Sequence, residues 1–149
     1  GFDVAYDDGG TYLRSLEDES LGGLVMIQVI EHLSAQDAMD VVALAARKVR
    51  RGGRVIIETV NPQSLYVFAR SFYLDPTHLR PVHPAYVGFL FREAGFAEIE
   101  IDWRNPPRRQ EALEELDGDD DTTRRMNANI ANLNTLLFAP QDYAVIATR

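Results

Sequence analysis

Short apolar runs alternate with helical patterns along this chain. Residues 21–30 form a nearly continuous apolar run, which is typical of a strand covered on both faces in a parallel sheet. Ser34 is a residue type that favours a helix start, and apolar side chains then recur at helical spacing. They are Ala38, Val41, Val42, Ala45 and Val49. Gly52 and Gly53 are expected to end this helix, and a strand at 54–59 follows. The unit predicts two parallel strands joined by a right-handed crossover.

The same patterns predict the remaining elements. A helical turn is expected at residues 11–16, and Asn61-Pro62 is expected to open a helix that runs to about residue 72. Further helices are expected at 84–94, closed by Gly95, and at 122–137, and further strands at 2–6, 97–103 and 141–148. This order of elements predicts an α/β fold in a single domain, residues 1–149. Residues 105–121 are interpreted as a polar excursion, a solvated linker with some helix at 111–116.

Composition narrows the functional classes. The 149 residues suffice for a hydrophobic core, and the absence of cysteine excludes disulfides, thiolate catalysis and cysteine-ligated metal sites. A formal net charge of −8 argues against general binding to nucleic acid or anionic membranes. The apolar runs are too short to span a bilayer, and no signal-peptide pattern is visible. We therefore expect a cytoplasmic protein with a small-molecule partner, without nucleic acid and without a membrane span.

Several motifs together resemble class I S-adenosylmethionine-dependent methyltransferases. They are VIEHL at 29–33, RGGRVIIE at 51–58, EAGF at 93–96 and PQDYAVIA at 140–147. FYLDPTH at 72–78 and PVHP at 81–84 resemble a bacterial subgroup that often accompanies glycosyltransferases and surface-polysaccharide assembly. The resemblance implies a Rossmann-like sheet, mostly parallel with an antiparallel C-terminal strand, and S-adenosyl-L-methionine as cofactor.

The resemblance also implies what the chain lacks. In the family, a glycine-rich turn after the first strand and an acidic residue ending the second hold the cofactor. Neither is found, so by this comparison the domain is partial and lacks the first two strands. In the family's sheet order, 3-2-1-4-5-7-6, the strand at 21–30 would then have an unpaired apolar edge. Either another chain covers that edge, as in a homodimer, or the sequence is part of a longer protein.

Two functions remain open at this stage. One is methyl transfer to a small-molecule or carbohydrate-linked hydroxyl or phosphate acceptor, with this chain itself inactive if the missing strands are essential. The other is a non-catalytic binding or interaction module that retains the fold.

Four residues are candidates for cofactor binding. The resemblance places Asp8 and Gly9 where the family contacts the adenine, although Asp-Asp-Gly-Gly is also a turn sequence. Gln28 and Val29 stand at the carboxyl end of the central strand, where ligands of open α/β sheets bind.

Glu31, His32 and His78 are the candidate catalytic residues. Glu31 and His32 stand just before a helix, where they are either capping and solvated residues or groups that orient a hydroxyl and accept its proton. As a pair they offer too few ligands for a metal, so no metal site is predicted. His78 is placed in the loop at 74–83, and histidine suits a general base because it titrates near neutral pH.

The candidate substrate-binding residues share the acceptor side of the expected fold. They are Tyr73, Asp75, Arg80 and His83, with Tyr66 as a further surface for a sugar or phosphate. His83 is also placed to cap the helix that begins at Pro84.

Overall fold

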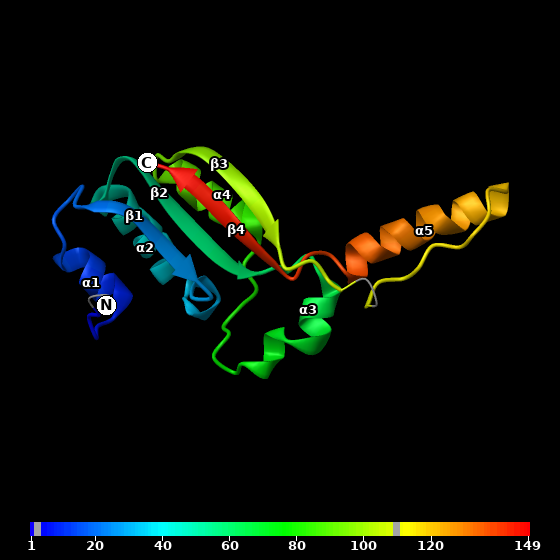
Figure 1. Ribbon diagram of the computed structural model, residues 1–149. Coiled ribbons are helices and arrows are strands. Elements are labelled where there is room, and N and C mark those ends of the chain that lie inside the picture. Colours follow the sequence, from blue (N-terminus) through cyan, green and yellow to red (C-terminus); the bar gives the residue numbers. More distant parts are fainter. Residues whose placement is uncertain (2–3, 109–110) are drawn as a thin grey trace.

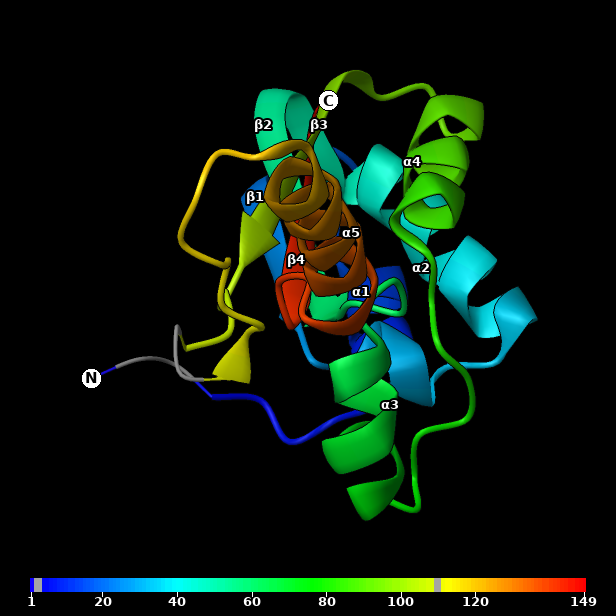
Figure 2. The same ribbon diagram turned by 90° about the vertical axis from the view of Figure 1, so that its right-hand side faces the viewer.

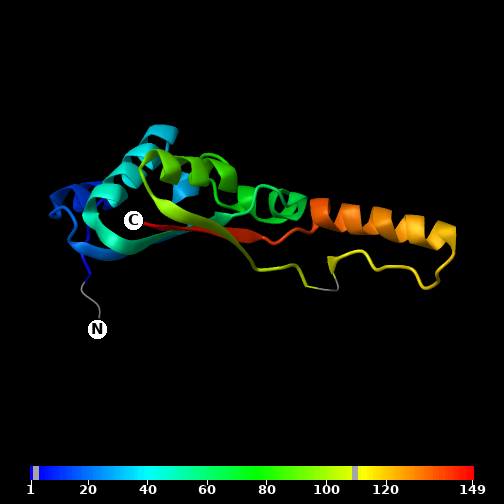
Figure 3. The ribbon, with the colours of Figure 1, turned by 90° about the horizontal axis from the view of Figure 1, so that it is seen from above.

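The computed structural model describes residue 1, residues 4–108 and residues 111–149 (Figure 1). A four-stranded sheet forms the body of the molecule, and a long helix projects from one end of it. The helices α2 and α4 lie on the same side of the sheet (Figures 2 and 3). Among the described residues, none of the helices has the length and apolar character that a membrane crossing needs.

The strand order is β1-β2-β4-β3. β1 (Leu21–Ile27) pairs in parallel with β2 (Val49–Val60), whereas β4 (Asp142–Thr148) lies antiparallel between β2 and β3 (Ala97–Arg104). This is the order 4-5-7-6 that the resemblance implies. The predicted α/β fold, with an antiparallel C-terminal strand beside the parallel pair, is confirmed.

The core lies between the sheet and the helices α2 (Ala35–Lys48) and α4 (Pro84–Glu93). Its fully buried side chains include Val42, Ile57 and Phe91. The opposite face of the sheet is open in the described residues. There Val25 is 59% and Ile27 is 55% exposed, so the prediction that this strand is covered on both faces was wrong for the described chain.

The helices α2 and α4 begin at the expected residues, but α2 ends earlier than expected. Ser34 Oγ accepts a hydrogen bond from the Asp37 N–H at 3.1 Å, which caps α2. The helix ends at Lys48, before the glycines expected to end it, because Val49 is already extended as the first residue of β2. Before α4, Nδ1 of His83 accepts from the Ala85 N–H at 3.1 Å, the capping role its position suggested.

Two local predictions in the first half of the chain were wrong. Residues 4–6 are not a strand, because no strand of the described chain lies beside them to pair with; residues 2–3 of that prediction fall outside the described residues. Asn61 does not start a helix: its side-chain oxygen accepts from the Gln63 N–H in a local turn, and its amide donates to the Pro140 carbonyl at 2.7 Å. The helix α3 (Leu65–Arg70) begins later, and the short 3₁₀ helix η2 (Phe72–Leu74) follows it.

The expected helical turn after Asp8 is α1 (Gly9–Ser15), which packs against α2. Asp8 Oδ1 accepts from the Thr11 N–H at 2.9 Å and caps this helix. The same bond is the main cause of a pKa for Asp8 below its ordinary value.

Residues 111–140 form an arm that projects from the body (Figure 1). Its helix α5 (Asp121–Leu137) confirms the prediction at 122–137, and none of its residues is buried. The helix expected at 111–116 is replaced by an extended strap from residue 113 onward. Asn134 exchanges two hydrogen bonds with the backbone of Leu113, both 2.8 Å, and Asn127 does the same with Leu116 at 2.8 and 3.0 Å. These pairs satisfy strap backbone groups that a helix would have satisfied internally.

Candidate functional site

A buried carboxylate lies just beyond the carboxyl end of β1. Gln28 adopts a positive φ of 53° and turns the chain into the short 3₁₀ helix η1 (Ile30–His32). The turn places the Glu31 side chain, which is fully buried, beside β2, where its Oε2 accepts from the Thr59 hydroxyl at 2.7 Å. Its Oε1 is buried with no hydrogen-bond partner. Because a buried unpaired carboxylate oxygen is costly, this atom marks the position where a partner is needed.

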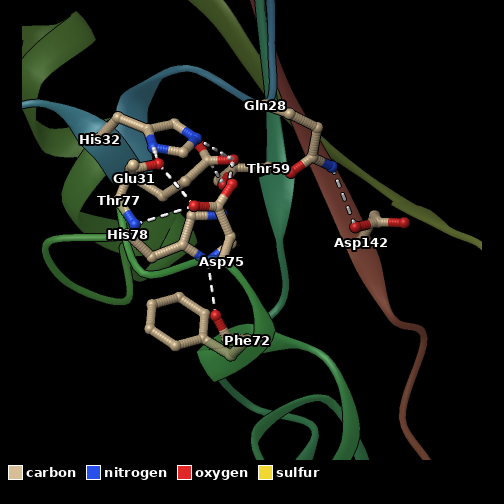
Figure 4. Close-up of polar contacts among 9 residues, drawn as sticks. All are labelled: Gln28, Glu31, His32, Thr59, Phe72, Asp75, Thr77, His78 and Asp142. Atoms are coloured by element: carbon tan, nitrogen blue, oxygen red, sulfur yellow. Dashed lines mark hydrogen bonds and ion pairs between the residues drawn. The ribbon is translucent and has the colours of Figure 1, made fainter.

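Two imidazoles face that oxygen (Figure 4). Nε2 of His32 lies 3.9 Å and Nε2 of His78 lies 4.0 Å from Glu31 Oε1, and the two rings have centroids 4.7 Å apart. Nδ1 of His78 is 2.7 Å from the Phe72 carbonyl. A carbonyl can only accept, so this nitrogen carries the proton and the Nε2 of neutral His78 has a free lone pair.

The tautomer of His32 is fixed by a relay of two side chains. The Thr77 hydroxyl donates to Asp75 Oδ1 at 2.6 Å, because an ionised carboxylate can only accept. Its single proton is thereby used, so the Thr77 oxygen accepts from Nδ1 of His32 at 2.9 Å. The hydroxyl bond from Thr77 is also the main cause that lowers the pKa of Asp75 and keeps it an acceptor. In both histidines, therefore, Nε2 is the nitrogen turned toward Glu31.

The loop that carries His78 is tied to η1 by its backbone. The Leu79 N–H donates to the Glu31 carbonyl at 2.9 Å. This bond brings together the three candidate catalytic residues, Glu31, His32 and His78, although a long stretch of chain separates the last from the others. Sequence reasoning had named all three but had not predicted that they meet, and it missed Thr59 and Thr77. The expectation of no metal site rested on two ligands, whereas the structure brings a third donor beside them.

Three of the four candidate cofactor residues line one cavity. The cavity, of about 420 Å³, runs along the free edge of β1, with Asp8, Gly9 and Val29 in its lining and apolar Leu24 in its wall. Gln28 lies elsewhere, since its side-chain amide donates to Asp142 Oδ1 at 3.2 Å (Figure 4). Residues 29–31 therefore connect the cluster of Glu31, His32 and His78 at the end of β1 with the cavity along the edge of that strand.

A second, polar cavity of about 620 Å³ is lined by residues of α3 and the base of the arm. Tyr66 donates to Glu111 Oε1 at 2.5 Å and accepts from Arg70 Nη1 at 2.7 Å. The bond to Glu111 is the main cause that raises the pKa of Tyr66. Arg70 and Arg108 both line this cavity, so it offers guanidinium and phenol groups to a polar ligand.

The remaining candidate substrate residues are dispersed. Tyr73 is 74% exposed and stands edge-on to Phe72. The Arg80 guanidinium lies 5.2 Å from the Tyr86 ring centroid, with its Nε and Nη2 buried and without a hydrogen-bond partner. His83 caps α4 and takes no part in the cluster around Glu31.

Comparison with known solved structures gives similarity in both sequence and fold to one methyltransferase, and similarity in fold alone to others. A SAM-dependent methyltransferase from Archaeoglobus fulgidus is 35% identical, with a TM-score of 0.95 over 99% of this chain and 68% of that one. Two others are similar in fold alone. Phosphoethanolamine N-methyltransferase 2 from Haemonchus contortus, solved with S-adenosyl-L-methionine, is 16% identical over 91% of this chain and 34% of its own, with a TM-score of 0.53. An O-methyltransferase family protein from Burkholderia thailandensis is 14% identical over 97% of this chain and 35% of its own, with a TM-score of 0.52. No protein-family model matches the chain, and no curated protein does.

Proposed function

The chain belongs to the S-adenosylmethionine-dependent methyltransferases, and from this premise we propose that it methylates a hydroxyl or phosphate oxygen of a small-molecule or carbohydrate-linked acceptor. The observation that carries the proposal is the buried Glu31 Oε1, which faces the Nε2 atoms of His32 and His78. This cluster lies at the carboxyl ends of the parallel strands, where open α/β sheets bind their ligands. The resemblance of residues 72–84 to the polysaccharide-associated subgroup supports a carbohydrate acceptor.

The residues present fit one end of the cofactor. Asp8 and Gly9 line the cavity along β1, where a carboxylate and a backbone N–H suit the amino group and ring nitrogen of an adenine. Leu24 and Val29 give the same cavity an apolar wall for the ring. When bound, S-adenosylmethionine supplies an electrophilic methyl group on its sulfonium sulfur.

The cluster is suited to accept the acceptor's proton. For a hydroxyl acceptor, the O–H proton would pass to an imidazole Nε2 as the oxygen takes up the methyl group. Glu31 Oε1 stabilises the imidazolium that results, in a buried position where the attraction of opposite charges is strong. The Phe72 carbonyl and the Thr77 hydroxyl hold the Nδ1 protons, so Nε2 is the basic nitrogen of each neutral ring.

The polar cavity supports an anionic or sugar acceptor. Arg70 and Arg108 present planar guanidinium groups, which recognise phosphate through two parallel hydrogen bonds. Tyr66 lines the same cavity, where its hydroxyl donates to Glu111 and accepts from Arg70, so it positions these two groups at the wall of the cavity.

A calorimetric titration of S-adenosylhomocysteine into the chain tests the cofactor half of the proposal. We expect binding that Asp8→Ala weakens at least tenfold, since the contact to the adenine amino group is lost. Asp8 also caps α1, so Asp120→Ala, which removes the equivalent cap from α5 far from the cavity, is the matched control and should bind normally. Absence of binding to a folded chain would reject catalysis by these residues and leave the non-catalytic binding module as the function.

A methyl-transfer assay tests the acceptor half. The substrates compared are a glycan with a terminal phosphate and the same glycan without it, each supplied with labelled S-adenosylmethionine. We expect methylation that His78→Gln reduces at least tenfold while S-adenosylhomocysteine binding stays unchanged. Equal rates for wild type and His78→Gln would remove the cluster from the mechanism.

A further inference from the structure

We infer that Glu31, His32 and His78 form a binding site for one divalent transition-metal ion of the zinc class. The ion would occupy the same Nε2 lone pairs that accept the proton in the proposed methyl transfer, so a filled site would exclude that proton transfer. Binding of the ion is measured without cofactor or acceptor, so its outcome is distinguishable from that of the proposed function.

The donor atoms are close enough to share one ion. One ligand atom from each of the three residues lies within 4.8 Å of the others. The two distances to Glu31 Oε1 are 3.9 Å from His32 Nε2 and 4.0 Å from His78 Nε2. Zinc binds imidazole nitrogen and carboxylate oxygen at about 2.0–2.2 Å, which places two ligands of a tetrahedral ion about 3.4 Å apart. The observed distances are somewhat longer, so side-chain rotations must draw the three donors together around the ion.

Each donor is held from behind by a protein group, as metal ligands usually are. The Phe72 carbonyl holds Nδ1 of His78, Thr77 holds Nδ1 of His32, and Thr59 holds the second oxygen of Glu31. These bonds direct the remaining donor atoms toward one point and leave their lone pairs free. These hydrogen bonds restrict the side-chain rotamers of all three donors. A cluster of solvated surface side chains would not require that restriction.

The buried oxygen gives independent support. Glu31 Oε1 is excluded from water and has no hydrogen-bond partner, and a divalent cation would satisfy both its charge and its lone pairs. The His32 side chain is 29% exposed and the His78 side chain 12%, so the site opens to solvent on the His32 side. That side offers a fourth coordination position for water or an acceptor oxygen. Two imidazoles and one carboxylate favour zinc, cobalt or nickel over magnesium or calcium.

The test is a calorimetric titration of Zn²⁺ into the chelator-treated full chain. We expect one ion per chain with micromolar or tighter affinity, undiminished by millimolar Mg²⁺. Replacement of Zn²⁺ by Co²⁺ should give the visible absorption of a four-coordinate ion. His78→Ala and Glu31→Gln should each weaken zinc binding at least tenfold, whereas His83→Ala, the same substitution in a histidine that caps α4, should leave the affinity unchanged.

A second variant guards against loss of the fold. Thr77→Val keeps every donor atom and removes only the support of His32 Nδ1, so it should bind zinc about tenfold more weakly while its circular dichroism is unchanged. Absence of zinc binding to the folded wild-type chain would overturn the inference. Binding that Glu31→Gln and His78→Ala leave unaltered would overturn it equally. Failure of S-adenosylhomocysteine to bind would bear on the proposed function alone.

Discussion

The body and the arm of this molecule are stabilised in opposite ways. In the body, helices are held by burial, with Val42 on α2 and Phe91 on α4 closed against the sheet. In the arm, α5 has no buried residue and is held by its cap and by the paired hydrogen bonds of its asparagines to the strap. The comparison teaches that a regular helix in this chain is no evidence of a core beneath it. Local free energies of opening should therefore differ between the two regions.

Backbone hydrogen bonds of Gln141 close the base of the arm, beside the side-chain contacts of Tyr66 with Glu111 and Phe138. The Gln141 N–H donates to the Asn105 carbonyl at 3.0 Å, and the Asn61 N–H donates to the Gln141 carbonyl at 2.7 Å. The chain thus leaves the sheet after β3 and returns before β4 at neighbouring positions. This closure allows the body to pair its strands whether or not the arm is formed.

The largest expected difference between the regions comes from matched large-to-small substitutions. Phe91→Ala should lower the free energy of unfolding by about 3–5 kcal/mol, because a fully buried ring is lost and a cavity remains. Leu133→Ala, at a position 44% exposed on α5, should change it by less than about 0.5 kcal/mol. Urea denaturation followed by tryptophan fluorescence measures both. Similar losses in the two variants would contradict the contrast.

Removal of the arm should have a smaller effect. With residues 113–136 replaced by a short Gly-Ser linker, the free energy of unfolding of the body should change by less than about 1 kcal/mol, because loop-closure entropy depends only weakly on loop length. The contacts of Tyr66 with Glu111 and Phe138 at the base are kept in this variant. Urea denaturation is again the measurement, and loss of cooperative unfolding would show that the arm is part of the folding unit.

The smallest expected effect is a pH dependence confined to the arm. The hydroxyl of Thr123 and the N–H groups of Thr123 and Thr122 donate to Asp120 and lower its pKa from 3.8. The ionised cap therefore stabilises α5 above pH 3.8, and this contribution is lost as pH falls through the lowered value. Nuclear magnetic resonance should show the Thr123 amide losing protection there. Asp120→Asn keeps a capping oxygen without the titration, so the same acid transition in that variant would refute the assignment.

The parts of the fold that the sequence predicted are those set by local chemistry. Ser34 and His83 begin their helices, and the apolar spacing after Ser34 gives the face that α2 buries. The errors occur where a distant partner decides the outcome. Residues 4–6 have a strand pattern but no neighbouring strand, and Asn61 caps only a local turn while its side-chain amide donates to the Pro140 carbonyl.

The site follows the same rule. Glu31, His32 and His78 could be named from their residue types and from the resemblance, since each stands beside a strand end or in the acceptor-side loop. Thr59 and Thr77 could not, because a hydroxyl becomes important only through the atoms placed against it. Pairing of β1 with β2 is what brings Thr59 opposite Glu31.

The turn at Gln28 also limits the distance between the cavity along β1 and the cluster around Glu31. Val29 lines the cavity along β1 and Glu31 directs its carboxylate into the cluster, and two residues of backbone separate their Cα atoms by at most about 7 Å. The backbone therefore limits the distance between the two sites, and the hydrogen bonds of the 3₁₀ turn reduce its flexibility. A ligand that moves Val29 by a fraction of an ångström must displace Glu31 as well. The nuclear magnetic resonance chemical shifts of the His32 and His78 imidazoles would then change when a ligand occupies the cavity.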